Sequence, residues 1–197
     1  MSADISLVYL EDRDTSLLVE ASLYDCIQPK HLDDFEQLWK PLRSTQAEQH
    51  GHWDWRKKVE RRAGELAYRS FAIEFSDQTQ GLMIVNTTER CRLQGQANKH
   101  LVYIDYLEAA PWNRRRVEGH PSYRGIGTVL VAAAIQLSMD EGNHGRVGLH
   151  SLPQADAFYR DKCGMTDLGP DASYPRYPLR YFEMTEGQAR SFMQHTR

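Results

Sequence analysis

The sequence predicts one mixed α/β domain in which helices flank a central sheet. Short, β-rich apolar runs recur along the chain, and two early stretches place apolar residues at helical spacing. In the second half a strand-like run, a glycine turn, a helix-like run and another strand-like run follow in that order, which is typical of a βαβ unit. A hairpin pattern before this unit adds antiparallel pairing, so we expect a mixed sheet. The 197 residues are enough for one domain with a substantial core.

The net charge, the cysteines and the apolar runs of the sequence limit the partners and the cellular compartment that we expect. The formal net charge of −3 argues against a general nucleic-acid binder, and the basic runs at 56–62 and 114–116 are interpreted as solvated faces. Three scattered cysteines without a CxxC pair indicate reduced thiols. The N-terminus lacks the features of a signal peptide, and no run reaches the ~18 apolar residues of a membrane span. We therefore expect a cytoplasmic protein without a membrane partner. His50 and His52 have no recognisable co-ligands, so no metal site is predicted.

The first half is predicted to contain a strand, two helices and a hairpin. Residues 5–10 form a β-rich run that ends in a charged turn. Residues 31–42 and 52–66 each carry an apolar stripe at helical spacing, with a polar loop at 44–51 between them. In the second of these helices the stripe is formed by Trp55, Val59, Ala63 and Leu66. Residues 70–75 and 82–85 alternate like strands around the polar segment SDQTQG, which predicts a hairpin.

The second half is predicted to alternate strands and helices. Residues 86–99 are mostly polar and are interpreted as a short strand plus loop, and residues 101–107 carry the strongest strand signal of the chain. A long basic loop then leads to a helix at 128–140, which ends near Gly142 or Asn143. The remaining expected elements are a strand at 146–149, a helix at 153–164, strands at 165–168 and 179–184, and a last helix at 186–195.

Gly125 and Gly127 stand between the strongest strand and the helix that follows it. Two glycines with one residue between them allow backbone N–H groups to approach one another without Cβ clashes. At the start of a helix these N–H groups lack intrahelical acceptors and carry the positive end of the helix dipole, so they can bind an anion. The alternative is a plain strand-to-helix turn.

Two motifs in this order give the second half a family resemblance. Gly125 and Gly127 match the Q/R-x-x-G-x-G/A pyrophosphate motif of the GNAT superfamily of acyl-CoA N-acyltransferases, with Ser122 in the place of Gln or Arg. The later segment ADAFYRDKCGM resembles that family's A-x-x-F-Y-x-x-x-G-F motif. It matches at Ala155, Phe158, Tyr159 and Gly164, and departs from it at Met165, with Leu152 where an Asn often stands. The resemblance covers residues 101–183.

The resemblance implies one GNAT-like domain over residues 1–197, with a CoA-binding core at about 101–168 and a mostly antiparallel sheet splayed at its middle. It implies acetyl-CoA as co-substrate and no metal. The pyrophosphate is then held by the backbone amides of Tyr123, Arg124, Gly125, Ile126, Gly127 and Thr128. Arg124 adds a charged contact and Thr128 a hydroxyl. The pantetheine arm runs along residues 107–111, where the N–H of Ala109 or Ala110 polarises the acyl carbonyl.

The implied reaction is direct attack by a primary amine in a ternary complex. Tyr159 is the implied acid that protonates the departing thiolate, and packing as a core aromatic is its alternative role. Glu108 is the candidate base, with an ion-pair role as its alternative. Asp105 lies three residues earlier and therefore on the other face of a regular strand. His120 and His150 are alternate bases with a suitable intrinsic pKa.

The acceptor is not identified by any sharp cluster. In the family the acceptor wall comes from the first two helices and from the hairpin of the late strands, which correspond here to residues 33–55 and 174–181. A small-molecule or protein amine is expected as acceptor, and a homodimer remains open. Two other functions also remain open. One is a catalytically silent CoA-binding or regulatory module, which is compatible with the departures from the family motifs at Ser122 and Leu152. The other is a tRNA-acetylating toxin, which the negative net charge disfavours.

Overall fold

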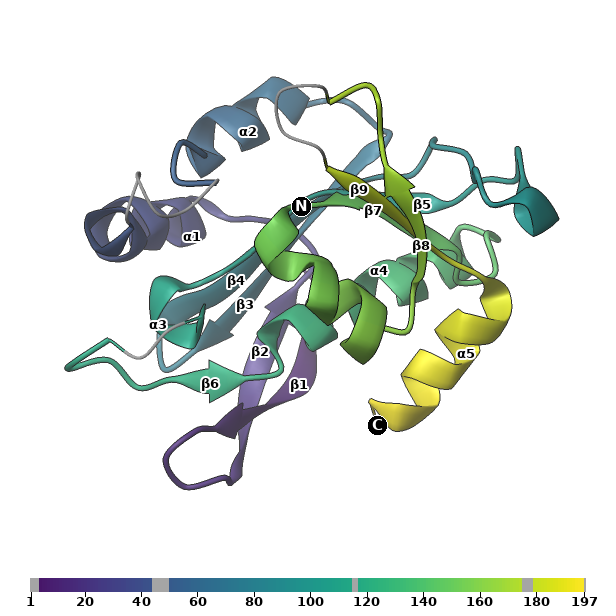
Figure 1. Ribbon diagram of the computed structural model, residues 1–197. Coiled ribbons are helices and arrows are strands. Elements are labelled where there is room, and N and C mark those ends of the chain that lie inside the picture. The colour runs from purple at the N-terminus through teal and green to yellow at the C-terminus, as the bar shows by residue number, and fades with distance from the viewer. Residues whose placement is uncertain (1–3, 44–49, 115–116, 175–178, 197) are drawn as a thin grey trace. The chain divides into compact units, whose positions relative to one another are not determined.

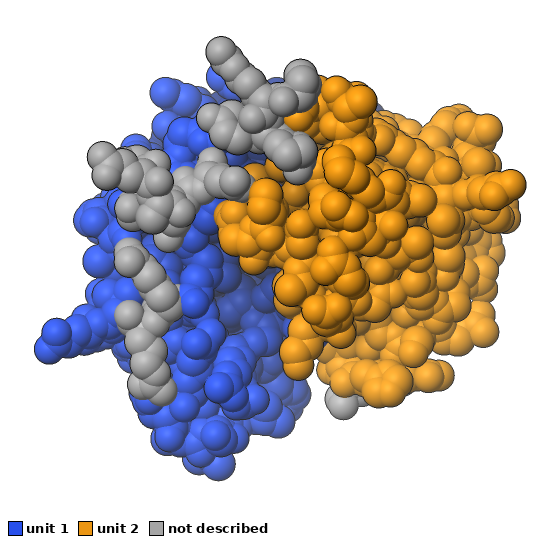
Figure 2. Space-filling view, in the orientation of Figure 1, with its two compact units in different colours: residues 1–84, 106–130 blue, residues 85–105, 131–197 orange. Residues whose placement is uncertain are grey.

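The computed structural model describes residues 4–43, 50–114, 117–174 and 179–196. Within these ranges nine strands form one mixed sheet in the order β6-β1-β2-β3-β4-β5-β7-β9-β8, with helices beside it (Figure 1). This confirms the predicted mixed, mostly antiparallel α/β class. The chain divides into two compact units, residues 1–84 with 106–130 and residues 85–105 with 131–197, which are coloured separately in Figure 2.

The first unit contains the start of the sheet and the early helices. Its elements are β1 (Ile5–Asp12), β2 (Leu18–Tyr24), α1 (Pro29–Asp34), α2 (Trp55–Arg62), β3 (Tyr68–Phe75), most of β4 (Gln78–Asn86), the end of β5 (Val102–Ala109), α3 (Pro111–Arg114), β6 (Tyr123–Arg124) and the start of α4 (Ile126–Asp140). After α1 the chain continues through a π-helical turn, Phe35–Trp39, and a 3₁₀ turn, Lys40–Leu42. β1 pairs antiparallel with β2, and β2 with β3.

The predicted opening strand and first helix are confirmed, but β2 was not predicted. The β1–β2 turn is held by the Asp12 carboxylate, which accepts hydrogen bonds from the N–H groups of Asp14 and Thr15 at 2.9 Å. β2 carries Glu20 and Ser22 and is buried only at Ala21. A strand without a buried face lacks the apolar alternation by which strands are recognised.

The second helix is shorter than predicted. Asp54 caps its N-terminus by accepting the N–H of Lys57 at 3.0 Å, and the helix ends at Arg62 because Ala63 is extended and Gly64 takes φ +82°. Leu66 was expected on the buried stripe but is 87% exposed. The predicted extension to residue 66 is therefore wrong.

The hairpin of β3 and β4 is confirmed with a tighter turn than expected. Ser76 and Asp77 both take positive φ, 51° and 59°, so the strands join through two residues and β4 begins at Gln78. Gly81 consequently lies inside β4. A Cβ at this position would lie 2.5 Å from Cγ2 of Ile126 and 3.2 Å from Cδ1 of Leu130. Glycine here lets the first turns of α4 pack directly on the strand.

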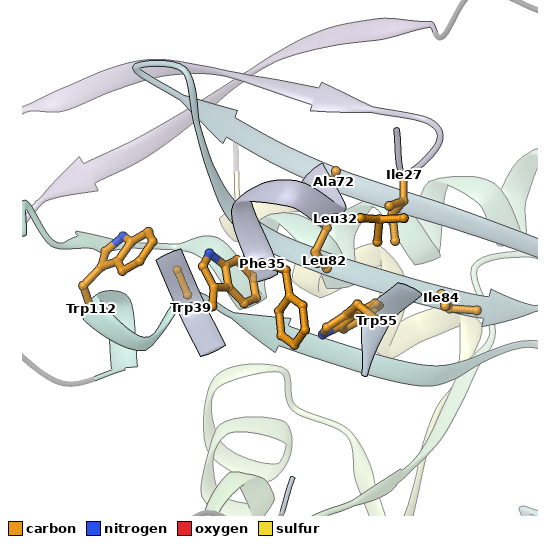
Figure 3. Packing of buried hydrophobic residues seen from close by; sticks show 10 residues of the cluster. Ile27, Leu32, Phe35, Trp39, Trp55, Ala72, Leu82, Ile84 and Trp112 are labelled. Atoms are coloured by element: carbon orange, nitrogen blue, oxygen red, sulfur yellow. The ribbon is translucent and has the colours of Figure 1, made fainter. Parts of the chain in front are cut away.

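Large aromatic side chains dominate the core of the first unit. Trp112, Trp39, Phe35 and Trp55 lie in a row beside β4, the strand that carries Leu82 and Ile84 (Figure 3). The rings of Phe35 and Trp39 are 5.8 Å apart and those of Trp39 and Trp112 are 6.3 Å apart, both edge-to-face. The Trp39 indole N–H donates to the carbonyl of Thr79 at 3.1 Å, which satisfies its polar atom. This row packs α3 and the π-helical turn that follows α1 against the same sheet.

The second unit contains the late strands and helices. Its elements are the remainders of β4, β5 and α4, together with β7 (Val147–Ser151), β8 (Thr166–Pro170), β9 (Arg180–Met184) and α5 (Glu186–His195). Residues 86–99 show only a bridge between Arg90 and His100 and a 3₁₀ turn, Gln94–Gln96. The predicted helix at 153–164 is a 3₁₀ turn, Pro153–Ala155, followed by a π-helical turn, Phe158–Lys162.

The pairing of the second unit agrees with the predicted βαβ centre. Val102–Ile104 of β5 pairs in parallel with Val147–Leu149 of β7, and β9 pairs antiparallel with both β7 and β8. The bounds predicted for the last helix are confirmed. The Thr185 hydroxyl accepts the N–H of Gln188, and the N–H of Thr185 donates to Oε1 of Gln188, so the two residues form a capping box at the start of this helix. The predicted splay and the single-domain organisation concern both units and stay predictions. No helix among the described residues is long and apolar enough to cross a membrane.

We predict that Gly81→Ala destabilises the protein, because the added methyl group meets side chains of α4. The expected loss is about 1–3 kcal/mol in the free energy of unfolding, measured by urea denaturation. Gly187→Ala is the matched control, since Gly187 lies in the first turn of α5 with no atom within 4 Å of an added Cβ. The control is expected to be neutral or to stabilise by up to about 1 kcal/mol. Equal stability of Gly81→Ala and the wild type would contradict the packing described.

Candidate functional site

The glycine turn joins β6 to α4 in the first unit. Gly125 takes φ +94°, a conformation that residues with a side chain rarely adopt, and its carbonyl accepts the N–H of Val129 at 2.8 Å. α4 therefore begins at Ile126, two residues before the predicted start, and runs for 15 residues. The N–H groups of Ile126, Gly127 and Thr128 belong to its first turn, where no intrahelical acceptor exists. A Cβ on Gly125 would contact nothing within 4 Å, so the turn requires glycine for its backbone conformation and not for lack of space.

Short hydrogen bonds to α3 hold the chain in place before the turn. The Ser122 hydroxyl donates to the carbonyl of Trp112 at 2.7 Å, and the Tyr123 N–H donates to Oδ1 of Asn113 at 2.8 Å. Asn113 and Trp112 in turn donate to Oε1 of Gln80 in β4, both at 2.9 Å. Ser122 is buried, so the side chain at the family's Gln/Arg position serves the protein interior here.

Few side chains around the turn are available to a ligand. The Tyr123 ring is buried edge-on against Phe75, with centroids 5.0 Å apart, so Tyr123 offers only its backbone. Arg124 is 61% exposed and forms an ion pair with Glu11 of β1 at 2.9 Å. Thr128 is partly exposed. Only Arg124 and Thr128 of the six predicted residues can therefore add side-chain contacts.

The two alanines at the end of β5 differ in how their N–H groups are used. The N–H of Ala110 donates to the carbonyl of Gln80 in β4 at 2.9 Å. Successive N–H groups of an extended chain point to opposite edges, so the N–H of Ala109 faces away from β4. Of the two predicted carbonyl-binding groups, Ala109 is the one that is not already used by β4.

Glu108 lies in a buried polar cluster. Its Oε2 accepts the indole N–H of Trp55 at 2.7 Å. Its Oε1 lies 3.4 Å from Nε of Arg43, 3.5 Å from Nε2 of His50 and 3.6 Å from a terminal guanidinium nitrogen of Arg114. Only 1% of the carboxylate side chain is exposed. These contacts show a carboxylate that is fixed in position and surrounded by positive charge.

The other members of the cluster were not anticipated from the sequence. Arg114 belongs to a basic run that was expected to be solvated, but its side chain turns inward and contacts the His50 imidazole. That expectation is wrong for Arg114. Burial, followed by the charges of Arg114, Arg43 and His52, lowers the pKa of His50 to about 3. His50 is therefore neutral at physiological pH and accepts hydrogen bonds. The only sequence signal was the presence of two arginines and a histidine, which does not specify where they point.

Tyr159 lies in the second unit, within the π-helical turn. Its carbonyl accepts the N–H of Met165 at 3.0 Å, and Gly164 reverses the chain with φ +64°. The ring lies 6.0 Å from that of Phe182 and is buried, and burial raises the pKa of the phenol. π-helical turns are rare and frequently occur at functional sites.

The remaining candidates have defined surroundings. His120 stacks on Trp112 at a centroid distance of 5.0 Å, so it supports the loop before the glycine turn. His150 hydrogen-bonds Tyr103 and Asp171, and Asp105 is partly buried in β5. Among the described residues, no group of three or more His, Cys, Asp and Glu could hold a metal ion. Residues 108–110 and 123–128 thus belong to the first unit, and Tyr159 and His150 belong to the second.

Comparison with known proteins gives structural neighbours only. No family model and no curated protein matches the sequence. The chain resembles FeeM, an N-acyl amino acid synthase from uncultured soil microbes, with 12% identity, a TM-score of 0.57, and coverage of 87% of this chain and 93% of the other. It resembles an acetyltransferase of the GNAT family from Streptococcus pneumoniae at 15% identity and a TM-score of 0.51, covering 83% and 96%.

A further neighbour was solved with ligands. The spermidine N-acetyltransferase from Vibrio cholerae, in complex with CoA and spermine, matches at 16% identity and a TM-score of 0.53, covering 86% of this chain and 97% of that one. These matches span most of each chain at TM-scores above 0.5. The chain therefore has the fold of the GNAT N-acyltransferases.

Proposed function

We propose that this protein transfers an acetyl group from acetyl-CoA to a primary amine, by direct attack in a ternary complex. The observation that carries the proposal is the first turn of α4, where Gly125 at φ +94° presents three consecutive N–H groups within a GNAT fold. The neighbours include a spermidine N-acetyltransferase with bound CoA and an N-acyl amino acid synthase. They support acyl transfer to an amine in general, and acetyl is the donor group that we propose.

The diphosphate of CoA would bind at the start of α4. The N–H groups of Ile126, Gly127 and Thr128 would donate to its oxygens, and the helix dipole favours the negative charge. Arg124 is positioned to exchange its ion pair with Glu11 for a phosphate, because the side chain is already exposed beside the turn. With Ser122 turned inward, backbone groups carry most of this binding.

The acyl group would be activated at the end of β5. The amine nitrogen attacks the thioester carbonyl, a C–N bond forms, and the carbonyl oxygen becomes an oxyanion. We propose that the N–H of Ala109 stabilises this oxyanion, since the N–H of Ala110 is engaged by Gln80. The C–S bond then breaks with its electron pair on sulfur, and Tyr159 donates its phenolic proton to the thiolate.

The proton of the attacking amine needs an acceptor, for which Glu108 was the first candidate. Its carboxylate already accepts the Trp55 N–H and lies within 3.6 Å of Arg43 and Arg114. These contacts favour the alternative in which Glu108 balances two buried cations and fixes the end of β5. Its role as base stays a prediction that a variant can decide.

The first prediction is that acetyl-CoA raises the melting temperature of the wild-type protein. At a ligand concentration of 100 Kd the stabilisation is about 2.7 kcal/mol. Gly127→Glu should abolish the shift, because its carboxylate repels the diphosphate at the second residue of α4. Gly187→Glu is the matched control, since it places the same side chain at the second residue of α5, and it should keep the shift. A wild-type protein without any shift would contradict acyl-CoA binding.

The next prediction concerns Tyr159→Phe, which removes the proposed acid and keeps the ring that packs on Phe182. We expect thiol release to fall at least about tenfold, with unchanged stabilisation by acetyl-CoA. Since burial raises the phenol pKa, no alkaline limb from Tyr159 is expected below pH ~10, its ordinary value. The assay follows free thiol over a panel of amines that includes spermidine, an amino acid and a peptide N-terminus. Full activity of this variant at every pH would show that Tyr159 only packs.

Glu108→Gln separates the two roles of Glu108. The amide oxygen can still accept the Trp55 N–H, but the charge opposite Arg43 and Arg114 is lost. If Glu108 balances these cations, the free energy of unfolding falls by about 3–5 kcal/mol and the pH–rate profile of the folded enzyme keeps its shape. This is the result we expect. Wild-type stability together with the loss of the acidic limb would instead establish Glu108 as the base.

A further inference from the structure

The β1 strand presents apolar side chains to solvent near the edge of the sheet. Ile5, Leu7 and Tyr9 lie on one face of this strand and are 58%, 61% and 53% exposed. Leu10, on the opposite face, is completely buried. Single exposed apolar side chains are ordinary, but three that follow one another along one face of a strand mark a candidate interaction surface.

The backbone polar groups of the same three residues point away from β2. On the β2 side, the N–H of Asp12 donates to the carbonyl of Leu17 at 2.9 Å. The carbonyl of Asp4 likewise accepts the N–H of Asp25 at 3.1 Å. On the other side, the N–H of Arg13 donates at 2.9 Å to the carbonyl of the residue that precedes β6. Because backbone groups alternate in direction along a strand, the even-numbered residues of β1 bond β2 and the odd-numbered residues face outward.

The short strand β6 covers only the end of this outward edge. Among the residues that the structure describes, the strand partners of β1 on this side are Tyr123 and Arg124, which lie opposite Asp12 and Glu11. After β6 the chain enters α4. The described part of the chain therefore leaves the edge open along residues 5–9.

This stretch lacks the features that keep an exposed edge from pairing. Native edge strands are commonly protected by Pro, by a β-bulge or by charged side chains, Lys above all. Residues 5–9 read ISLVY and contain none of these residue types, and the register with β2 runs from Ile5 to Glu11 without a shift. An edge of this kind can accept a further strand through backbone hydrogen bonds.

A second copy of β1 matches this edge under a two-fold axis. Antiparallel pairing centred on Leu7 places Ile5 opposite Tyr9 of the second copy, and Leu7 opposite Leu7 of the second copy. Every cross-strand pair on the exposed face is then apolar, and no like charges meet. Glu11 lies outside the paired stretch and already forms an ion pair with Arg124. The surface is therefore complementary to itself.

The area available at this edge fits a reversible dimer. Side chains of this size that are about half exposed present on the order of 100 Å² each, so the three supply roughly 300 Å² per copy. A specific interface needs about 1,000 Å² in total, which is about 500 Å² per copy. The backbone edge, together with Ser6 and Val8 on the other face, contributes to the remainder. The dimer population is accordingly expected to rise with protein concentration.

We propose that two copies of this chain pair through the open edge of β1, antiparallel and across a two-fold axis, so that the sheet continues from one copy into the other. Each outward-facing residue among Ile5, Leu7 and Tyr9 then exchanges both of its backbone hydrogen bonds with the second copy. The surface does not involve the start of α4 or the end of β5. The pairing consequently does not depend on the acyl transfer proposed above.

The test measures the molar mass by sedimentation velocity from about 1 to 200 µM protein, without substrate. The wild type should shift from the monomer mass to twice that mass as the concentration rises. Leu7→Pro removes an N–H that points outward and that β2 does not use, so this variant should stay monomeric. Leu7→Lys places two ammonium groups side by side at the axis and should also stay monomeric. Leu18→Lys is the matched control, because Leu18 is 69% exposed on the same face but lies in β2, and it should dimerise as the wild type does.

Hydrogen exchange provides a second readout at the level of single amides. The amides of Ile5, Leu7 and Tyr9 should exchange more slowly at high than at low protein concentration. Those of Ser6 and Val8, which bond β2 in either state, should not change.

Three results would overturn the proposal. The first is a wild-type protein that remains monomeric over the whole concentration range. The second is a dimer that persists in both Leu7→Pro and Leu7→Lys. The third is a dimer that persists in Leu7→Pro and is lost in Leu18→Lys, because the copies would then pack through the exposed faces and not through the strand edge. If Leu7→Pro does not fold, Leu7→Lys and the hydrogen exchange of the wild type decide.

Discussion

The first turn of α4 depends on one backbone constraint, the left-handed conformation of Gly125. This conformation takes the chain from β6 into α4, whose first three N–H groups have no intrahelical acceptor. Neighbouring residues hold the turn and the start of α4 in place. Gly81 lets α4 pack directly on β4, and Ser122 and Asn113 fix the approaching strand by hydrogen bonds. The anion site that we propose is built from backbone groups, so it does not require a side chain at position 122 that reaches a phosphate.

Buried charge is the second constraint, and it shapes the end of β5. Glu108 lies among Arg43, Arg114 and His50, which come from segments far apart in the chain. Removing one charge from such a cluster leaves others uncompensated, so its members depend on one another. The second unit holds a comparable group in Arg92, Asp171 and His150.

Sequence reasoning succeeded where a local pattern decides the structure. The glycine turn and the last helix have local signals, in the spacing of two glycines and in the Thr185 cap, and both were predicted. β2 was missed because a strand that buries little has no alternating pattern. The helix at 55–62 was extended too far because Gly64 ends it with a backbone conformation that periodicity does not report.

The directions of side chains could not be predicted, because they are set by tertiary packing. Ser122 was recognised as a departure from the motif, but its bond to Trp112 depends on where α3 lies. Arg114 belongs to a run of three arginines, and only the position of Glu108 explains why it turns inward. His150 was named as an alternate base, yet its partners Tyr103 and Asp171 are 47 and 21 residues away in the sequence. Such contacts join residues without a fixed spacing.

The most direct measurement of the central claim is a titration of ¹⁵N-labelled protein with CoA, followed through its backbone amide resonances. If the start of α4 binds the diphosphate, the largest shifts occur at Ile126, Gly127 and Thr128, whose N–H groups gain acceptors. Shifts confined to other parts of the chain, with these three resonances unchanged at saturating CoA, would contradict the account.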